Sequence, residues 1–461
     1  MNPEKFSATR SLSGSQGNSS VHSILAVVFI AVLLMDSLLS DLSTFVNQSF
    51  SESARVTLFS AIAILAVIFG GRLVLSDTRK IRSEFSSNNI LNFASRIMPF
   101  IQYSILALLI VITLQMIFTS QYYTYIMITL TGMSWAASIG FMLLMSYKLI
   151  QWYRVRRNLL VLLYFVSSAL IASVLALGIV PQIVIMTQTS SFSVSSHSSE
   201  TKPFQANPVD LTGLYVILSV VNWLVIPLSF IIWAATAVML RHYANSFGPR
   251  KYWLMISLPL VSIIIGVTFF LIFQSSVTTV FDPNVIVYTM IAFGGILSEG
   301  FLLGFAFIKI SKHHRGITQS RLSGYLLLSA KGVTILFVAF FANPSGGSYL
   351  PFGIISVSFL CYGTYLFFSG IYSCAITIAG DIRLRQTIRK SLLDESKLLD
   401  NIGLADLNHE VERVTTEIVK KHNQTVWQET GIDASIPEND MKDYVNEVAG
   451  EIEKIRQRRA R

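Results

Sequence analysis

The sequence predicts an all-α protein: a polytopic transmembrane helical bundle of about ten helices, followed by a small cytosolic helical domain. Three observations predict this fold. Of the 461 residues, 52% are hydrophobic and only 13% are charged, whereas an ordinary soluble domain has roughly 25% charged residues. The apolar residues form ten runs long enough to cross a bilayer. Basic residues are concentrated in every second connection between these runs, as the positive-inside rule requires.

The N-terminal segment, residues 1–20, is rich in Ser, Asn and Gly and has few apolar side chains, so it is expected to be a disordered cytosolic tail. The first apolar run starts late, near residue 21, and no clear small-x-small cleavage site follows Leu39. We therefore interpret this run as a retained transmembrane helix and not as a cleaved signal peptide.

The ten apolar runs define a transmembrane domain over residues 21–378, since about twenty apolar residues cross the ~30 Å hydrocarbon core. The runs that start at 158 and 211 are near thirty residues long, so they must tilt, kink or project beyond the bilayer. The expected kink points are Pro181, Pro227 and Pro259. The ten runs lie at 21–39, 56–75, 97–118, 125–147, 158–186, 211–240, 252–273, 285–308, 322–342 and 351–378.

The charges of the connections predict the orientation of the chain. The second, fourth, sixth and eighth connections each carry three or four Lys or Arg residues, whereas the odd-numbered connections carry only Arg55 and Lys202. By the positive-inside rule the even-numbered connections are cytosolic, which places the N-terminus and the C-terminus in the cytoplasm. These basic residues follow membrane topology, so the lipid bilayer is the expected partner and nucleic acid is not.

Residues 187–210 are then expected to form an external loop, in which Pro203 and Pro208 argue against a helix. This loop is either a solvated connector or a binding lid. On the same side, Asn47 begins an N-glycosylation sequon, although a position close to the membrane would prevent its use.

The apolar region divides around this loop into two parts, 21–186 and 211–378, each with five predicted helices. An odd number of helices per half gives the two halves opposite orientations, as in inverted-repeat transporters. No matching residues connect the halves, however, so an inverted repeat and a coincidence of lengths both remain open.

No soluble-enzyme motif occurs in the chain, neither a phosphate-binding loop, nor Gly-x-Ser-x-Gly, nor His-Glu-x-x-His, nor a dinucleotide fingerprint. No Cys or His spacing fits a zinc or haem site, and Cys361 and Cys374 point to separate faces of one helix. We therefore expect no catalytic residues, no cofactor and no metal, although an intramembrane catalyst built from scattered residues would lack such motifs.

Two ionisable residues lie deep in predicted helices, Glu299 and Lys331. Each is nine residues, or roughly 13 Å, from the cytosolic end of its run, and the two runs are consecutive and antiparallel. A buried ion pair is therefore predicted, because an isolated charge in hydrocarbon costs several kcal/mol. The pair either fixes the helix register or forms a proton or ion site.

The sequence around Glu299 is unusually rich in small residues. Gly300 and Gly304 are spaced for close helix contact. Either the helix packs tightly here, or it is locally broken and its freed backbone groups coordinate an ion. The residues of this predicted break are Gly294, Gly295, Gly300 and Gly304.

Other polar residues in the apolar runs have simpler interpretations. Asp36 lies about one turn from the outer end of its helix, so we expect a solvated interfacial carboxylate. Asn222 and Gln115 are deeper, and single amides usually find a partner on a neighbouring helix.

The C-terminal segment, residues 379–461, is predicted to be a cytosolic amphipathic helical domain. It shows three apolar stripes of helical period, near 384–402, 407–418 and 435–455. Such stripes bury against each other, a second copy of the chain or a cytosolic protein partner. Four basic residues at its start are expected to contact anionic lipid headgroups: Arg383, Arg385, Arg389 and Lys390.

This C-terminal part also resembles a recurring segment in uncharacterised archaeal polytopic membrane proteins. The resemblance rests on Tyr372-Ser373-Cys374-Ala375-Ile376, Asp381, Leu384-Arg385, Ile388-Arg389, Leu398-Leu399 and Ile402-Gly403. It implies an archaeal origin and a location in the plasma membrane, and it implies no particular activity.

Two classes of function remain open. A membrane sensor or scaffold would couple the bundle to the cytosolic helical tail, and the direct continuation of the last run into the first amphipathic stripe favours this class. A secondary transporter would instead use the polar residues in the middle of the membrane. The sequence favours the sensor or scaffold narrowly, with the transporter as the alternative.

Overall fold

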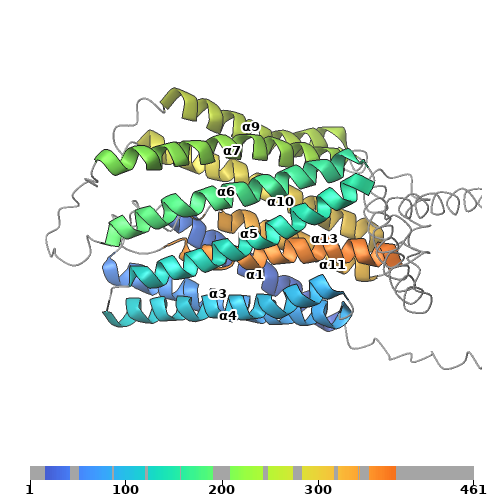
Figure 1. Cartoon of the computed structure of the whole chain (residues 1–461), viewed down its shortest axis with the longest axis horizontal. Helices are drawn as coiled ribbons and strands as arrows, with labels where there is room; N and C mark the ends of the chain where they lie inside the picture. Colours follow the sequence, from blue (N-terminus) through green and yellow to red (C-terminus); the bar gives the residue numbers. More distant parts are fainter. Residues whose placement is uncertain are drawn as a thin grey trace, which may run out of the picture. The chain divides into compact units, whose positions relative to one another are not determined.

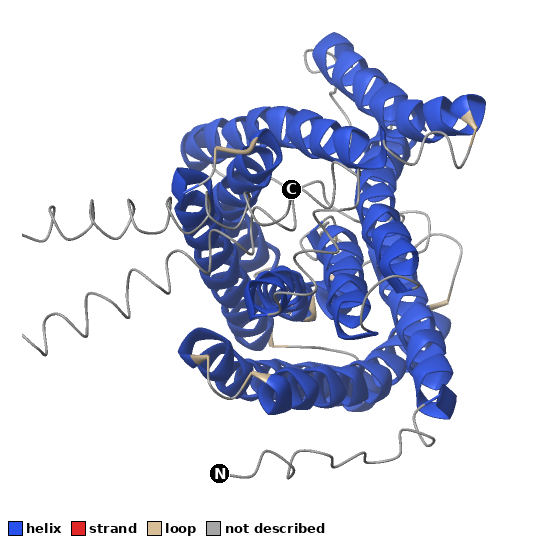
Figure 2. Cartoon of the chain, turned by 90° about the vertical axis from the view of Figure 1, so that its right-hand side faces the viewer, coloured by secondary structure: helices blue, strands red, loops and turns tan. Residues whose placement is uncertain are grey.

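The computed structural model describes most of the chain before residue 381. The described residues are 16–41, 51–85, 88–119, 123–155, 157–190, 208–241, 248–273, 283–315, 320–340, 342 and 352–380. Every secondary-structure element in these ranges is a helix, and none of the described residues lies in a strand (Figure 2). The predicted helical class of the fold is therefore confirmed.

The helices follow the predicted apolar runs (Figure 1). Among the described residues, nine helices are long and apolar enough to cross a membrane. These helices indicate a membrane protein. The helix at the eighth run, α10, is not among the nine, although it has 33 residues. The helices are α1 (Gln16–Asp41), α3 (Glu52–Glu84), α4 (Asn89–Thr119), α5 (Thr124–Val155), α6 (Leu159–Ser190), α7 (Pro208–Arg241), α9 (Pro249–Phe273), α10 (Pro283–Arg315), α11 (Ser320–Phe340), α12 (Ile354–Ser358) and α13 (Leu360–Gly380).

Several helices extend beyond their apolar runs. Helix α1 begins at Gln16, inside the segment that was expected to be disordered tail. Helix α6 continues to Ser190 and α7 starts at Pro208, so both ends of the expected external loop are helical. Proline is well suited to this first helical position, because its missing N–H would have no partner there. The length of an apolar run is set by the thickness of the hydrocarbon core, whereas the helix itself can continue into the polar region on either side.

The chain divides into two compact units, residues 1–149 with 162–373, and residues 150–161 with 374–461. In the second unit the described residues form the end of α5, the start of α6 and the last turns of α13. The side chain of Asn158 accepts the backbone N–H of Leu160 at 2.8 Å, which caps the start of α6. The predicted C-terminal domain beyond Gly380, its four juxtamembrane basic residues included, lies outside the described residues.

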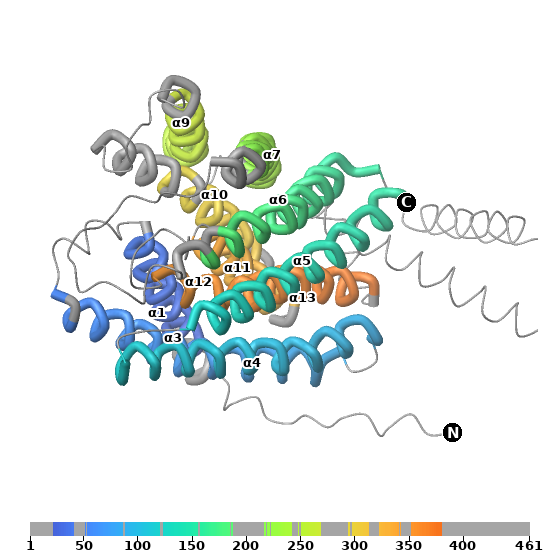
Figure 3. The backbone as a smooth tube through the Cα atoms, turned by 60° about the vertical axis from the view of Figure 1, so that its left-hand side comes forward, coloured from blue at the N-terminus to red at the C-terminus, as the bar shows by residue number. Residues whose placement is uncertain are grey.

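In the first unit, α1 packs on α3 and α11, α3 on α4, and α10 on α7, α9 and α11 (Figure 3). Of the nine long apolar helices, the two most enclosed are α11 and α13, in which 83% and 89% of the most apolar stretch is buried. Glycines let these two helices touch. A Cβ atom on Gly363 would lie 2.7 Å from the backbone nitrogen of Leu336, and one on Gly370 2.7 Å from that of Ser329. Close backbone approach of this kind is typical of membrane helix pairs.

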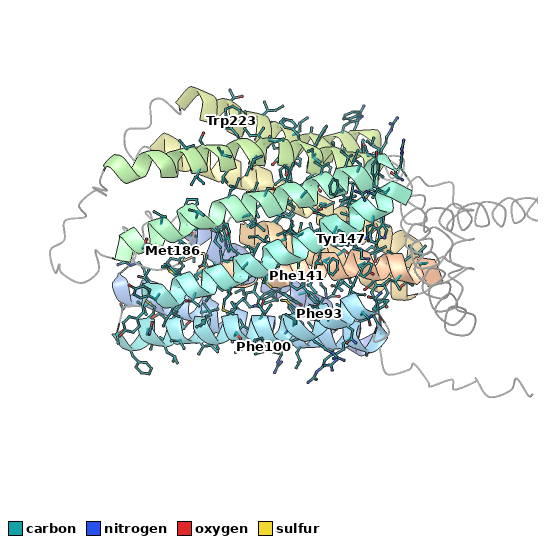
Figure 4. All side chains as sticks on the ribbon, in the orientation of Figure 1. Phe93, Phe100, Phe141, Tyr147, Met186 and Trp223 are labelled. Atoms are coloured by element: carbon teal, nitrogen blue, oxygen red, sulfur yellow. The ribbon has the colours of Figure 1, made fainter. Side chains whose placement is uncertain are left out.

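Apolar side chains also cover the outside of the first unit. Phe93 and Phe100 on α4 and Trp223 on α7 are 66%, 75% and 52% exposed (Figure 4). Of the nine long apolar helices, α9 is the least enclosed, with 28% of its most apolar stretch buried. Exposed apolar area on this scale is unfavourable in water and is typical of a surface in contact with lipid.

Candidate functional site

Glu299 lies at the centre of α10, sixteen residues or about 24 Å from each end of the helix. Its side chain is 2% exposed, and neither carboxyl oxygen has a hydrogen-bond partner among the described residues. The Ser229 hydroxyl of α7 is close enough to interact with the carboxyl group, but it makes no regular hydrogen bond with either carboxyl oxygen. A buried carboxyl group in this state is a strong candidate for a functional role.

A small hollow adjoins Glu299, with room for about one water molecule. Its walls come from α6, α7, α10 and α11, and Ser229 is the other polar residue in them. A second hollow of similar size shares four apolar side chains with the first and also reaches Tyr164 and Ser167 of α6. The shared side chains are Ile171, Ile232, Leu336 and Phe337.

The predicted ion pair between Glu299 and Lys331 is not formed, since neither carboxyl oxygen of Glu299 has a hydrogen-bond partner in the described part of the chain. The helix register explains the difference. Gly300 packs against Phe337 and Gly304 against Thr334, so Glu299 is level with Phe337. Lys331 lies six residues further down α11, or about 9 Å along its axis. The prediction had placed Glu299 opposite Lys331 because both are nine residues from the cytosolic end of their apolar runs. This did not give the correct helix register, because α10 continues beyond its apolar run to Arg315.

Of the two alternatives for the glycine-rich sequence around Glu299, the broken helix is wrong, because α10 is continuous from Pro283 to Arg315. Tight packing, the alternative, is present at three of the four glycines. Gly300 and Gly304 contact α11, and a Cβ atom on Gly295 would lie 3.0 Å from the Ser262 side chain of α9. Gly294 has no atom within 4 Å of that position.

A break does occur in the last apolar run, which forms the short α12 and then α13 (Figure 3). Between them, the backbone N–H of Phe359 bonds to the carbonyl oxygen of Ser356 at 3.0 Å and so leaves the regular i→i−4 pattern. Gly353 precedes α12 with φ of +91°, a conformation that favours glycine. The aromatic ring of Phe359 packs edge-on against Phe29 of α1, with ring centroids 4.8 Å apart.

Asp36 of α1 holds the start of α12. Its side chain is fully buried, and its two carboxylate oxygens accept the backbone N–H groups of Gly353 at 3.0 Å and Ser356 at 2.7 Å. The Ser356 hydroxyl in turn donates to the carbonyl oxygen of Leu33 at 2.8 Å. The expectation of a solvated carboxylate was therefore wrong. Asp36 satisfies the backbone donors that every helix leaves unpaired at its first turn.

The end of α12 is held by side chains from two other helices. Gln102 of α4 donates through Nε2 to the carbonyl oxygen of Ser358 at 2.9 Å, and Ser134 of α5 donates to that of Val357 at 2.6 Å. Gln102 lies about 20 Å from the first residue of α4 and about 26 Å from the last, so the break is near the middle of this helix. The other amide atom, Gln102 Oε1, is buried and accepts no hydrogen bond from any described residue.

One further buried polar pair joins α13 to α3. The Tyr362 hydroxyl donates to Asp77 Oδ2 of α3 at 2.8 Å. Tyr365, one turn later, is equally buried, but among the described residues its hydroxyl has no partner. The sequence analysis missed Asp77, Tyr362 and Tyr365. An acidic residue two residues beyond an apolar run, as Asp77 is, was the available signal.

No family model, curated protein or solved structure matches this chain.

The resemblance to archaeal membrane proteins and the inverted repeat both stay predictions. Of the two amides expected to find partners, Gln115 accepts the backbone N–H of Tyr123 through Oε1 at 3.2 Å, and the Asn222 side chain lies outside the described residues.

Proposed function

We propose that the chain is a proton-linked secondary transporter and that Glu299 binds and releases the proton. The observation that carries this proposal is a buried carboxyl group at the centre of α10, beside a hollow of water size, whose oxygens accept no hydrogen bond from the described part of the chain. Acidic residues within membrane helices are rare and typically mark proton relays or ion pathways.

The surroundings of Glu299 favour a proton over a larger ion. Its hollow is lined by apolar side chains except for Ser229, so it offers too few oxygen ligands for a metal cation. An ionised carboxylate without a partner costs far more in such surroundings than a neutral carboxylic acid. The resting group is therefore the protonated acid, and deprotonation requires water or a conformational change.

The second hollow indicates the side of the membrane from which a proton would reach Glu299. It lies one turn further along α10, at Leu303, and it is lined by Tyr164 and Ser167 near the start of α6. Under the proposed orientation, with both termini cytosolic, this is the cytosolic side of Glu299. The two hollows would then form the inner half of a proton path, in the plasma membrane if the archaeal resemblance is correct.

The broken helix supports transport as the class of function. Discontinuous membrane helices are a recurrent feature of secondary transporters, where they place polar backbone groups at the binding site. Here the break between α12 and α13 is held by Asp36, Gln102 and Ser134. A sensor or scaffold, the class that the sequence favoured, would act through residues 381–461, which lie outside the described residues. We favour the transporter because of the buried Glu299 carboxyl group and the broken helix, and the sensor or scaffold stays the alternative.

A pH jump on supported membranes tests this proposal without knowledge of the substrate. The purified full-length chain is reconstituted into vesicles that are adsorbed on a capacitive electrode, and the external pH is stepped. A proton that binds halfway through the membrane moves charge across part of the bilayer, so a transient current is expected. Glu299→Gln, which has the same shape and cannot ionise, should abolish this current.

The matched control is Ser298→Ala. Ser298 is the neighbour of Glu299 and donates only to the carbonyl oxygen of Gly295 in its own helix, at 2.5 Å. This variant should keep the transient current. If Glu299→Gln displaces as much charge as the unchanged chain, Glu299 is not the proton site and the proposal is wrong.

A further inference from the structure

The break between α12 and α13 gathers oxygen atoms that have lone pairs to spare. The carbonyl oxygen of Ser358 accepts one side-chain hydrogen bond and can accept a second interaction, whereas that of Val357 already accepts both the Ser134 hydroxyl and the backbone N–H of Phe359. The Ser134 and Ser358 hydroxyls are used as donors, so their own lone pairs are free to act as ligands. All four groups belong to fully buried residues.

Gln102 provides the observation that points to a ligand. Its side chain is 0% exposed, and its Oε1 atom accepts no hydrogen bond from the described residues. The orientation of the amide is fixed, because the opposite orientation would place Oε1 against the carbonyl oxygen of Ser358. Oε1 shares a carbon atom with Nε2 and therefore lies beside that carbonyl. An unpaired buried acceptor costs about 1–3 kcal/mol, so this atom requires a donor or a cation.

A second unpaired oxygen lies on the neighbouring helix. The Thr131 hydroxyl of α5 is fully buried and has no partner among the described residues. Thr131 and Ser134 are three residues apart, so they share one face of α5, and Ser134 shows that this face meets α12.

We propose that these oxygens bind an alkali metal cation at the α12–α13 break. The ligands are Gln102 Oε1, the carbonyl oxygen of Ser358 and the hydroxyl of Ser134. Neutral amide, carbonyl and hydroxyl oxygens suit a hard monovalent cation, whereas Ca²⁺ sites usually include carboxylates. The Asp36 carboxylate at the opposite end of α12 supplies a negative charge close by without occupying a ligand position.

This cation site is independent of the proposed proton site. Its ligands come from α4, α5 and the end of α12. Glu299 lies on α10, and none of these ligand residues lines its hollow. Failure of one proposal therefore leaves the other standing.

Thermal unfolding of the purified full-length chain tests the cation site. The melting temperature is measured in NaCl, KCl and choline chloride at the same ionic strength, and then as a function of the cation concentration. A cation that binds only the folded state raises the melting temperature in a saturable manner. We expect this response to Na⁺ or K⁺ and not to choline, and the two alkali arms show which cation the site prefers.

Gln102→Leu should raise the cation concentration at the midpoint roughly tenfold or more, because it removes a ligand worth 1.4 kcal/mol or more. Gln115→Leu, the same substitution on the same helix, should respond as the unchanged chain does, and so should Glu299→Gln. Ser134→Ala removes another ligand by a small change of side chain and should also raise the midpoint. This variant decides the question if Gln102→Leu does not fold.

Two results would overturn the site. If the unchanged chain responds to Na⁺ and K⁺ no more than to choline, then water and not a cation is the partner of Gln102 Oε1. A cation response whose midpoint is the same in Gln102→Leu and Ser134→Ala as in the unchanged chain would place the cation elsewhere.

Discussion

Asp36 Oδ2 accepts a 2.7 Å hydrogen bond from the backbone N–H of Ser356, which lies 320 residues further along the chain. This contact joins the first described helix to the break in the last one. Because the Asp36 side chain is fully buried, no water can replace it at the backbone donors of Gly353 and Ser356. The start of α12 therefore depends on a residue more than 300 positions earlier in the chain.

Replacing Asp36 should destabilise the fold markedly. Asp36→Leu leaves two buried N–H groups without acceptors, which should lower the free energy of unfolding by about 2–5 kcal/mol. Ser37→Ala is the control, since it removes one longer bond of 3.2 Å to the carbonyl oxygen of Val338. It should cost about 1 kcal/mol. Denaturant titration in detergent micelles measures both, and equal losses would mean that Asp36 does not hold α12.

The two buried tyrosines of α13 should respond differently to the same substitution. Tyr362→Phe removes the donor to Asp77 and should cost about 1–3 kcal/mol, because a buried carboxylate loses its partner. Tyr365→Phe removes a hydroxyl that has no described partner and keeps its ring contact with Phe141, so it should be neutral or slightly stabilising. Melting temperatures in the same detergent test this difference, and the reverse order would contradict the structure.

Gly332, where the enclosed helices α11 and α13 meet, should tolerate no side chain. A Cβ atom on Gly332 would lie 2.8 Å from the carbonyl carbon of Leu366, so Gly332→Ala should force α11 and α13 apart and cost about 1–3 kcal/mol. Gly294→Ala is the contrast, since no atom lies within 4 Å there and alanine favours a helix by up to about 1 kcal/mol. Thermal stability measures both, and a stable Gly332→Ala variant would show that the two helices are less closely packed.

Cysteine labelling tests the predicted orientation. Cys361 and Cys374 are both buried, so their background reaction with a membrane-impermeant maleimide should be low. A single cysteine at position 154 should be protected in intact cells and react after lysis, whereas one at position 197 should react in both. External labelling of position 154 would reverse the predicted topology.

The sequence was sufficient to locate the helices but not their register. Long apolar runs predicted the positions of α1 to α13, because burial in hydrocarbon requires them in any arrangement. The Glu299–Lys331 pair failed because a register depends on which side chains interlock. Phe337 against Gly300 and Thr334 against Gly304 set it, and the apolar pattern carries no information about such contacts.

The polar site was missed for a related reason. Asp36, Gln102 and Ser134 act on α12 from more than 220 residues away in the chain. The sequence analysis expected a solvated Asp36 and singled out neither Gln102 nor Ser134. Gly353, Ser356 and Ser358 in the last run were the local signal of a break, since three such residues weaken a helix that must satisfy its own backbone.

Infrared spectroscopy of Glu299 tests the central claim most directly. The full-length chain in lipid vesicles is compared with Glu299→Gln at neutral pH, in H₂O and in D₂O. The unchanged chain should show a carbonyl-stretch band of a protonated carboxylic acid that shifts in D₂O and is missing from Glu299→Gln. Identical spectra in this region would mean that Glu299 carries no proton in the resting state and would contradict its role as the proton-binding group.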